Sequence, residues 1–363
     1  MTENAIKLLV VDDSRIMRDA MAEMFADDSG IEIVGEAVTG IDALEGIRQY
    51  RPDVITLDVA MPEMDGITAL KHIMIQSPRP TLMLSSLTLE GARVAFDALR
   101  YGAVDFIAKP SNLNETSLAG QQAEIRSKIK YAAGVEVEAI KYIRSRQMTG
   151  SATQPAHEPG HKLVVFGAAE GGYGSLLKII PHLSPDLPVS YLVTLYAAPA
   201  HVAAFASYLD NISTVHVRQA MHEDIIRSGI CYLNSGADYM TVHKQGDAYI
   251  LHVSPAPFAS RKGAIDMLFF SAAELLGKDC TGVVLSGLDA DGAEGLEEVV
   301  HRHGAGLIQD PKTCFCKGMA SAAMARCKSA PIIPDADIAA QIGRLTDVDT
   351  DRDENPVQKA GLR

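Results

Sequence analysis

The segment Gly167-Ala168-Ala169-Glu170-Gly171-Gly172 has the spacing of a nucleophile elbow, the G-x-S-x-G turn that presents a serine to a substrate carbonyl. Its central position, residue 169, is alanine. The apolar run 162–166 predicts a buried strand and residues 176–180 predict the start of a helix, so the glycines fall at a strand-to-helix turn. A methyl group has no lone pair with which to attack a carbonyl. The sequence therefore predicts a turn built for hydrolysis that has lost its nucleophile.

A second set of reactive residues lies in the first third of the chain. Short β-branched runs alternate there with helical patterns, which is typical of a parallel α/β sheet. The predicted strands cover residues 7–11, 31–36, 54–57, 81–85 and 105–108. The polar residues that follow or close four of these strands are Asp12, Asp13, Asp58, Ser85 and Lys109. Because the chemistry of such sheets lies at the carboxyl ends of the strands, we expect these side chains to converge.

The three carboxylates predict a cation site. They cannot all stay ionised around one point without compensation, and a hard divalent ion with oxygen ligands, Mg²⁺, meets that need. Asp58 would then accept a phosphoryl group, with Lys109 and the metal neutralising its charge and the Ser85 hydroxyl bonding a phosphoryl oxygen. The alternative is that the carboxylates are solvated strand ends and that Lys109 is a surface lysine. Five coincidences at strand ends make that interpretation the weaker one.

Three stretches resemble the receiver domain of two-component response regulators: Val10-Val11-Asp12-Asp13-Ser14, residues 57–66 (LDVAMPEMDG) and Ala108-Lys109-Pro110. The resemblance implies that Asp58 is the phosphoacceptor. It also implies that Asp12, Asp13 and the main-chain carbonyl of Ala60 serve Mg²⁺ and that Lys109 contacts the phosphoryl group. Ser85 and Phe106 would be the hydroxyl and the aromatic side chain of the switch.

The second half resembles the chemotaxis methylesterase CheB family, which comprises protein-glutamate methylesterases and glutamine deamidases. The resemblance rests on the order receiver, linker and α/β domain, on the glycine loop 284–293 (VLSGLDADGA) and on residues 309–319. In that family a Ser-His-Asp triad cleaves a methyl ester. Matched by position, Ala169 replaces the serine, Tyr196 replaces the histidine and Asp291 keeps the aspartate. Glu170 and the segment 259–263 also depart from the family pattern, and Glu170 adds negative charge where an oxyanion would need stabilisation.

Other residues could in principle replace the missing nucleophile. Tyr196 lies beside Asp291, but an unperturbed tyrosine titrates near pH 10. Ser175 and Ser286 carry hydroxyls without an obvious histidine partner. His201 lies one helical turn beyond Tyr196 and is either an ordinary helix-surface residue or points elsewhere. We favour satisfied polar residues for this set over a displaced nucleophile.

The elements that must position these residues form two α/β domains. We expect a doubly wound, five-stranded, flavodoxin-like receiver at 1–128, then a connecting helix and flexible linker at 129–160. Helical character runs over 117–146, and the linker proper over 147–160. A doubly wound α/β domain of the CheB methylesterase type is expected at 161–345, and an acidic disordered tail at 346–363. Alternate aspartates from 347 to 353 resemble a calcium loop, but Arg352 and Gln358 stand where that loop needs glycine and glutamate.

Composition narrows the class of protein. A net charge of −13 over 363 residues argues against nucleic-acid binding and against an anionic membrane surface. Pro199 and His201 interrupt the apolar stretch 189–209, so we expect a strand and a helix there instead of a membrane span. Five scattered cysteines and the absence of a leader-like start favour a cytoplasmic protein. Cys314 and Cys316 are too few for a zinc site.

We therefore expect a chemotaxis-type response regulator, phosphorylated on Asp58 by a histidine kinase, whose effector domain has lost its esterase chemistry. A phosphorylation-controlled contact between the domains would bind or release a partner such as the kinase or a chemoreceptor array. The rival hypothesis is an active methylesterase and glutamine deamidase with a displaced nucleophile. A phosphate sink and phosphorylation-controlled oligomerisation are further alternatives.

Overall fold

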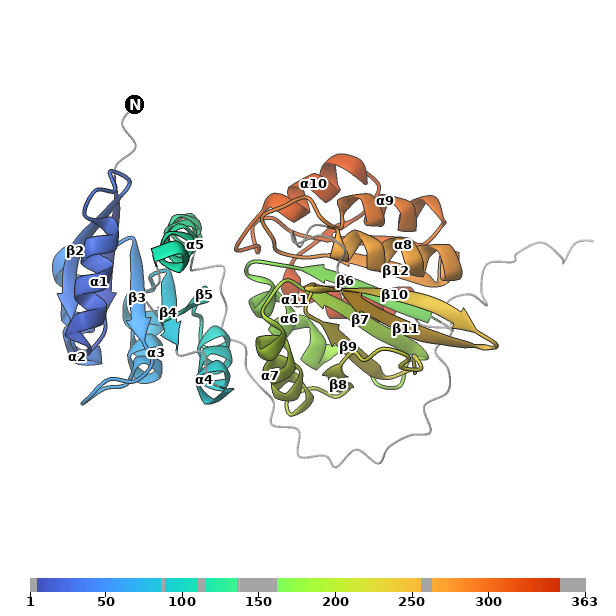
Figure 1. Ribbon diagram of the computed structural model, residues 1–363, viewed down its shortest axis with the longest axis horizontal. Helices are drawn as coiled ribbons and strands as arrows, with labels where there is room; N and C mark the ends of the chain where they lie inside the picture. Colours follow the sequence, from blue (N-terminus) through green and yellow to red (C-terminus); the bar gives the residue numbers. More distant parts are fainter. Residues whose placement is uncertain are drawn as a thin grey trace, which may run out of the picture.

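The chain folds into two α/β domains that lie side by side (Figure 1). The computed structural model describes residues 5–85, 89–109, 115–135, 137, 162–255 and 263–346. The expected linker at 147–160, the acidic tail from 347 onward and the segment 259–262 lie outside this part of the chain. No helix in the described ranges combines the length and the apolar character that a membrane crossing requires.

The first domain is the predicted doubly wound parallel sheet. Its strands lie in the order β2-β1-β3-β4-β5, with bounds β1 Ile6–Val11, β2 Ile31–Ala37, β3 Val54–Asp58, β4 Thr81–Ser85 and β5 Asp105–Ala108. Two helices share the core on one face, α1 (Arg15–Phe25) and α5 (Glu115–Ala133). Three cover the other face, α2 (Gly40–Tyr50), α3 (Gly66–Gln76) and α4 (Leu89–Arg100). Leu8 and Leu9 of β1 enter opposite cores, as the two-residue period of a strand requires.

The last receiver helix is shorter than expected. We predicted helical character as far as residue 146, but α5 ends at Ala133. Gly134 follows, and its N–H bonds the carbonyl of Tyr131 in a tight turn. Glycine is a poor helix former, which accounts for a stop at this point. Residues 138–146 lie outside the described part of the chain.

The second domain is also a parallel sheet with helices on both faces. The strand order is β14-β13-β12-β6-β7-β9-β8, with bounds β6 Lys162–Ala168, β7 Val189–Leu195, β8 His216–Gln219, β9 Ile230–Asn234, β12 Cys280–Val284, β13 Ala305–Gln309 and β14 Ile332–Ile333. One face carries α6 (Gly172–Ile179), α7 (Pro199–Asp210) and α11 (Asp335–Thr346). The other carries α8 (Ala264–Leu276), α9 (Ala293–His301) and α10 (Gly318–Arg326). Short 3₁₀ turns follow α6 (Ile180–His182) and α8 (Gly277–Asp279).

Two features of this domain bear on the sequence analysis. The apolar stretch 189–209 is β7 followed by α7, with Pro199 at the helix start, as predicted. The antiparallel hairpin of β10 (Asp238–Gln245) and β11 (Ala248–Pro255) was not foreseen. Its buried residues Met240, Val242 and Leu251 join the core beneath α8.

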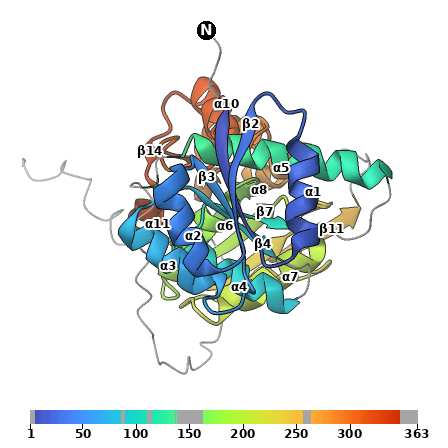
Figure 2. The same ribbon diagram turned by 90° about the vertical axis from the view of Figure 1, so that its left-hand side faces the viewer.

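An aromatic cluster joins the domains. Phe96 of α4 is inaccessible to solvent, and its ring centroid lies 5.5 Å from Tyr173, 4.9 Å from Phe205 and 5.4 Å from Tyr208. The Tyr208 hydroxyl donates to Asp97 Oδ1 at 2.6 Å, so a polar contact borders the cluster. Figure 1 places α4 and α5 on the side of the receiver that faces α6 and α7, and Figure 2 shows the receiver in front of the effector domain. One continuous apolar core therefore spans both domains.

We predict that Gly66→Ala destabilises the receiver by about 1–3 kcal/mol, because an added Cβ would overlap the backbone carbonyl of Asp58. Urea denaturation of the full chain measures the effect. The matched control is Gly120→Ala in α5, where the added methyl group meets open space. Since alanine is the better helix former, that control should gain about 0.5–1 kcal/mol. Equal destabilisation of the two variants would contradict the prediction.

Candidate functional sites

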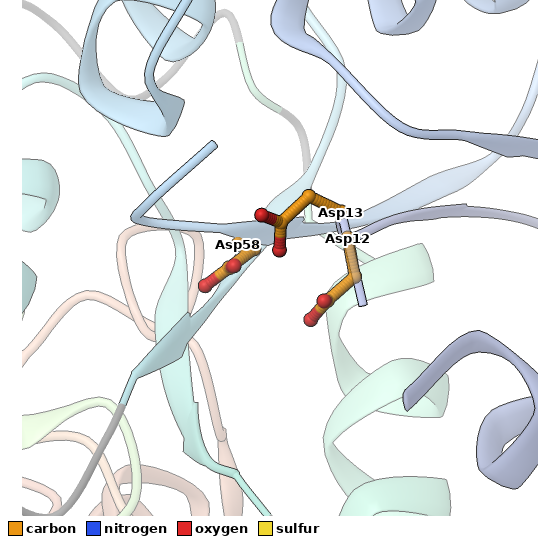
Figure 3. Close-up of side chains that lie close together, drawn as sticks. All are labelled: Asp12, Asp13 and Asp58. Atoms are coloured by element: carbon orange, nitrogen blue, oxygen red, sulfur yellow. The ribbon is translucent and has the colours of Figure 1, made fainter. Parts of the chain in front are cut away.

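The first site is a carboxylate cluster at the carboxyl edge of the receiver sheet (Figure 3). Asp12 follows β1 and Asp58 ends β3, and these neighbouring strands flank the point where the strand order reverses. One oxygen atom from each of Asp12, Asp13 and Asp58 lies within 4.8 Å of the others. Asp12 and Asp58 are buried, whereas Asp13 is exposed. The cluster is therefore open to solvent on the side of Asp13.

Lys109 completes this edge of the sheet. Its side-chain Nζ lies 3.0 Å from Asp12 Oδ2 and 2.8 Å from Asp58 Oδ1. Its main-chain N–H donates to the carbonyl of Ser85. Burial raises the pKa of Asp58, and the neighbouring Asp12 adds to this, while Lys109 opposes both. Burial alone would lower the pKa of Lys109, but its contacts with the two carboxylates outweigh burial and raise it. The lysine is therefore held as a cation.

The residues present fit a hard divalent cation. The donors are all carboxylate oxygens, which Mg²⁺ prefers. Asp12 Oδ2 is buried and makes no well-directed hydrogen bond, although Lys109 lies nearby. Within the described part of the chain, the ammonium of Lys109 pairs with two of the three carboxylates, which leaves negative charge uncompensated. The main-chain N–H of Ala60 donates a hydrogen bond to the Asp58 carboxylate and lowers the pKa of Asp58. Ala60 therefore also lies next to the carboxylate cluster.

Phe106 links the cluster to the effector domain. It lies on β5, three residues before Lys109, and its ring centroid is 5.2 Å from Tyr173 and 6.1 Å from His201. Lys128 of α5 donates to the Phe106 carbonyl at 2.6 Å and pairs with Asp105. Burial lowers the pKa of His201, and the positive charge of Lys128 adds to this. His201 is thus an interdomain residue, and of the two interpretations offered from the sequence the one in which it points elsewhere agrees with this contact.

The second site is the turn between β6 and α6. Ala169 is buried in this turn, its N–H donates to Ser286 O at 2.8 Å, and its carbonyl accepts from Gly172 N at 2.8 Å. Gly171 has φ +78°, and a Cβ there would collide with Phe315. The strand, the glycine turn and the helix therefore form the elbow that the sequence predicted, with a methyl group at its centre.

Tyr196 and Asp291 meet beside this elbow. Tyr196 follows β7 and Asp291 precedes α9, so with Ala169 they lie at the carboxyl ends of β7, β12 and β6, three adjacent strands. The Tyr196 hydroxyl donates to Asp291 Oδ2 in a short hydrogen bond and accepts from Ala264 N at 3.1 Å. Its ring lies where a Cβ at Gly236 would be, and Gly236 has φ +64°. The absence of a side chain at 236 makes room for the phenol.

The environment of Tyr196 keeps it protonated. Burial raises its pKa, and the hydrogen bond to the Asp291 carboxylate raises it further. A tyrosine is already neutral at pH 7 without such a shift. Tyr196 therefore has no accessible phenolate with which to act as a nucleophile.

The two candidate serines are satisfied polar residues, as we favoured. Ser175 Oγ donates to Gln309 Oε1 at 2.9 Å, and the same oxygen accepts from Ser286 N at 3.0 Å. Ser286 Oγ donates to the carbonyl of Glu170 at 2.6 Å and accepts from Cys316 N at 3.0 Å. The Ser175 hydroxyl bonds α6 to the end of β13, and the Ser286 hydroxyl bonds its loop to the elbow and to Cys316.

Sequence reasoning missed the groups that hold Asp291. Its carboxylate accepts from the backbone N–H groups of Gly263, Ile265, Asp266 and Gly292 at 2.9–3.2 Å. Three of these donors belong to the start of α8, whose unpaired N–H groups favour an anion. Burial raises the pKa of Asp266 to about 7, and the neighbouring Asp291 carboxylate contributes. A glycine before an apolar helical run was the available signal in the sequence.

We predict that Tyr196→Phe destabilises the effector domain by about 1–3 kcal/mol, because Asp291 loses its hydroxyl donor and Ala264 N loses its acceptor. Denaturant unfolding of the full chain measures this. Tyr173→Phe is the matched control, since the buried Tyr173 hydroxyl has no hydrogen-bond partner. The control should be neutral or stabilising, and a cost for Tyr173→Phe as large as that for Tyr196→Phe would refute the assignment.

Comparisons with known proteins identify the family. The profile of the response regulator receiver domain matches residues 8–119, and that of CheB methylesterase matches residues 164–342. The chain is 36% identical to the protein-glutamate methylesterase/protein-glutamine glutaminase of Pyrococcus abyssi over 89% of each chain. It is 34% identical to the protein of that name from Nitrosomonas europaea, over 93% of this chain and 95% of the relative. The CheB methylesterase catalytic domain of Thermotoga maritima aligns with a TM-score of 0.49 at 24% identity, over 51% of this chain and 98% of that domain. The chain belongs to the CheB family of chemotaxis response regulators, with a receiver domain followed by a CheB methylesterase domain.

Proposed function

We propose that this chain is a phosphorylation-switched regulator that binds its partners without hydrolysing them. The proposal rests on the match by position that puts Ala169 and Tyr196 where the family triad has its serine and histidine, and on the Tyr196–Asp291 hydrogen bond beside the elbow. Loss of either residue in such a triad costs on the order of 10⁶ in turnover. The relatives are named as methylesterases, so the proposal separates this chain from them in chemistry but not in fold.

In the receiver, Asp58 is the proposed phosphoacceptor, and a chemotaxis histidine kinase is its proposed donor. The Lys109 ammonium lies 2.8 Å from Asp58 Oδ1 and is placed to hold the transferred group. Asp12, Asp13, Asp58 and the carbonyl of Ala60 would hold Mg²⁺, which when bound offsets the charge of the phosphoryl oxygens. Ser85, which ends the neighbouring strand, would bond a phosphoryl oxygen through its hydroxyl.

The proposed switch runs through Phe106 to the domain contact. Lys109 and Phe106 lie on one short segment, so a shift of the lysine toward a phosphoryl group acts on the strand that carries the aromatic ring. That ring packs on Tyr173 and His201 of the effector domain. Phosphorylation would thereby weaken the contact and expose effector surface to a chemoreceptor or to another chemotaxis protein.

We expect the phosphorylated chain to release no methanol above background from methylated chemoreceptors and no ammonia from their glutamine side chains. Radiolabelled methyl release measures the first, and a coupled ammonia assay measures the second. An active relative such as the Pyrococcus abyssi protein serves as the positive control. Activity in the unmodified chain would overturn the proposal and favour a displaced nucleophile.

We also expect acetyl phosphate with Mg²⁺ to label the wild-type chain but not Asp58→Asn. In the labelled protein, amide exchange in α7 (Pro199–Asp210) should rise by about tenfold or more, because the covering aromatic contacts are lost. Hydrogen exchange with mass spectrometry measures this. Asp58→Asn under identical conditions is the control, and equal exchange in labelled and unlabelled protein would contradict the switch.

A further inference from the structure

Glu170 folds back across the elbow and contacts the aspartate loop. Its Oε2 accepts from Leu288 N at 3.1 Å, while its own carbonyl accepts from Ser286 Oγ at 2.6 Å. The side chain and the backbone of Glu170 thus bind the same loop from two positions. A hydrogen bond to a charged carboxylate is stronger than one between neutral groups.

The loop that Glu170 contacts lies directly against residue 169. Ala169 N donates to Ser286 O, and a Cβ built on Gly287 would come within 2.9 Å of Ala169 Cβ. Leu288 N is therefore the next backbone donor beyond the residue that touches the nucleophile position. In an acyl-transfer site, backbone N–H groups beside the nucleophile bind the oxygen of the acyl group.

We propose that Glu170 is a built-in occupant of this degenerate site, whose carboxylate takes the donor that would otherwise bind the oxygen of a carboxyl or carboxamide side chain. The proposal rests on the proposed function, because an occupied donor has no use in a site that turns over. Without Glu170, the site would accept an external carboxylate at Leu288 N.

Two physical features favour occupation from within the chain. Glu170 belongs to the elbow, one residue from its centre, so its carboxylate is held beside Leu288 N at an effective concentration that a free carboxylate in dilute solution does not reach. Its negative charge also interacts electrostatically with a cation of the receiver, Lys128. Burial alone would lower the pKa of Lys128, but Asp105, Glu124 and Glu170 oppose burial and the pKa is raised.

The test uses the full chain, ¹⁵N-labelled, with acetate as the probe. In Glu170→Ala the Leu288 amide should exchange about tenfold faster than in the wild type, as expected for the loss of one hydrogen bond. Acetate should then shift the Leu288 resonance saturably in Glu170→Ala. It should not do so in the wild type at the concentration that saturates the variant.

Two controls separate the proposal from a general loosening of the loop. Glu170→Gln keeps an acceptor oxygen in the same shape and should stay closed to acetate. Asp247→Asn removes one charge from an exposed turn of the same domain and should behave as the wild type. The proposal would be overturned if the exchange rate of the Leu288 amide were the same in Glu170→Ala and the wild type. It would also be overturned if acetate shifted the Leu288 resonance in the wild type, or in Glu170→Gln, as much as in Glu170→Ala.

The outcome is independent of catalysis. Methanol release by the unmodified chain would overturn the proposed function. The acetate titration would still decide whether Glu170 occupies the donor, because it reports binding at Leu288 N and no turnover.

Discussion

The burial of Phe96 and Phe106 against aromatic residues of the effector domain is the constraint on which the arrangement of the molecule depends. Phe96 is fully buried within a cluster that includes Phe205 and Tyr208, so the two domains share one hydrophobic core. Each Å² of apolar surface exposed on separation costs about 25 cal/mol. A switch that parts the domains must offset that cost. Phe106 is suited to this because it lies in the shared cluster and three residues from Lys109, whose ammonium holds Asp58.

A second aromatic contact places the receiver against the elbow. Tyr131 of α5 packs on Phe315 with a ring separation of 6.4 Å, and Phe315 lies where a Cβ at Gly171 would be. Phe315 therefore contacts both the receiver and the turn that carries Ala169. The contact depends on the glycine at 171, because only a residue without a side chain leaves that space to Phe315.

The receiver strands and the carboxylates at their ends could be predicted from the sequence, because their residue patterns are typical of one structure only. The strands of the receiver begin and end within about two residues of their predicted bounds, because β-branched runs end at polar residues such as Asp12 and Asp58 that belong at strand ends. The hairpin β10–β11 escaped prediction because it has few buried residues, with only Met240, Val242 and Leu251 buried over its two strands. The donors to Asp291 escaped as well. They are backbone N–H groups, three of them at the start of α8, and the glycine before that helix was the one signal for them in the sequence.

Tyrosine at 196 is chemically matched to alanine at 169. A triad histidine has two ring nitrogens, so it can bond the aspartate with one and the nucleophile with the other. A phenol has a single oxygen, and in Tyr196 that oxygen already donates to Asp291 and accepts from Ala264 N. The Tyr196 hydroxyl thus gives the buried Asp291 carboxylate a hydrogen-bond donor, but it cannot act as a base toward residue 169. Alanine at 169 needs no base, because its side chain has no acidic proton. If Ala169 and Tyr196 stand at the serine and histidine positions, as proposed, the pair keeps a hydrogen-bond donor for Asp291, which bonds the start of α8, and leaves no path for the proton of a serine.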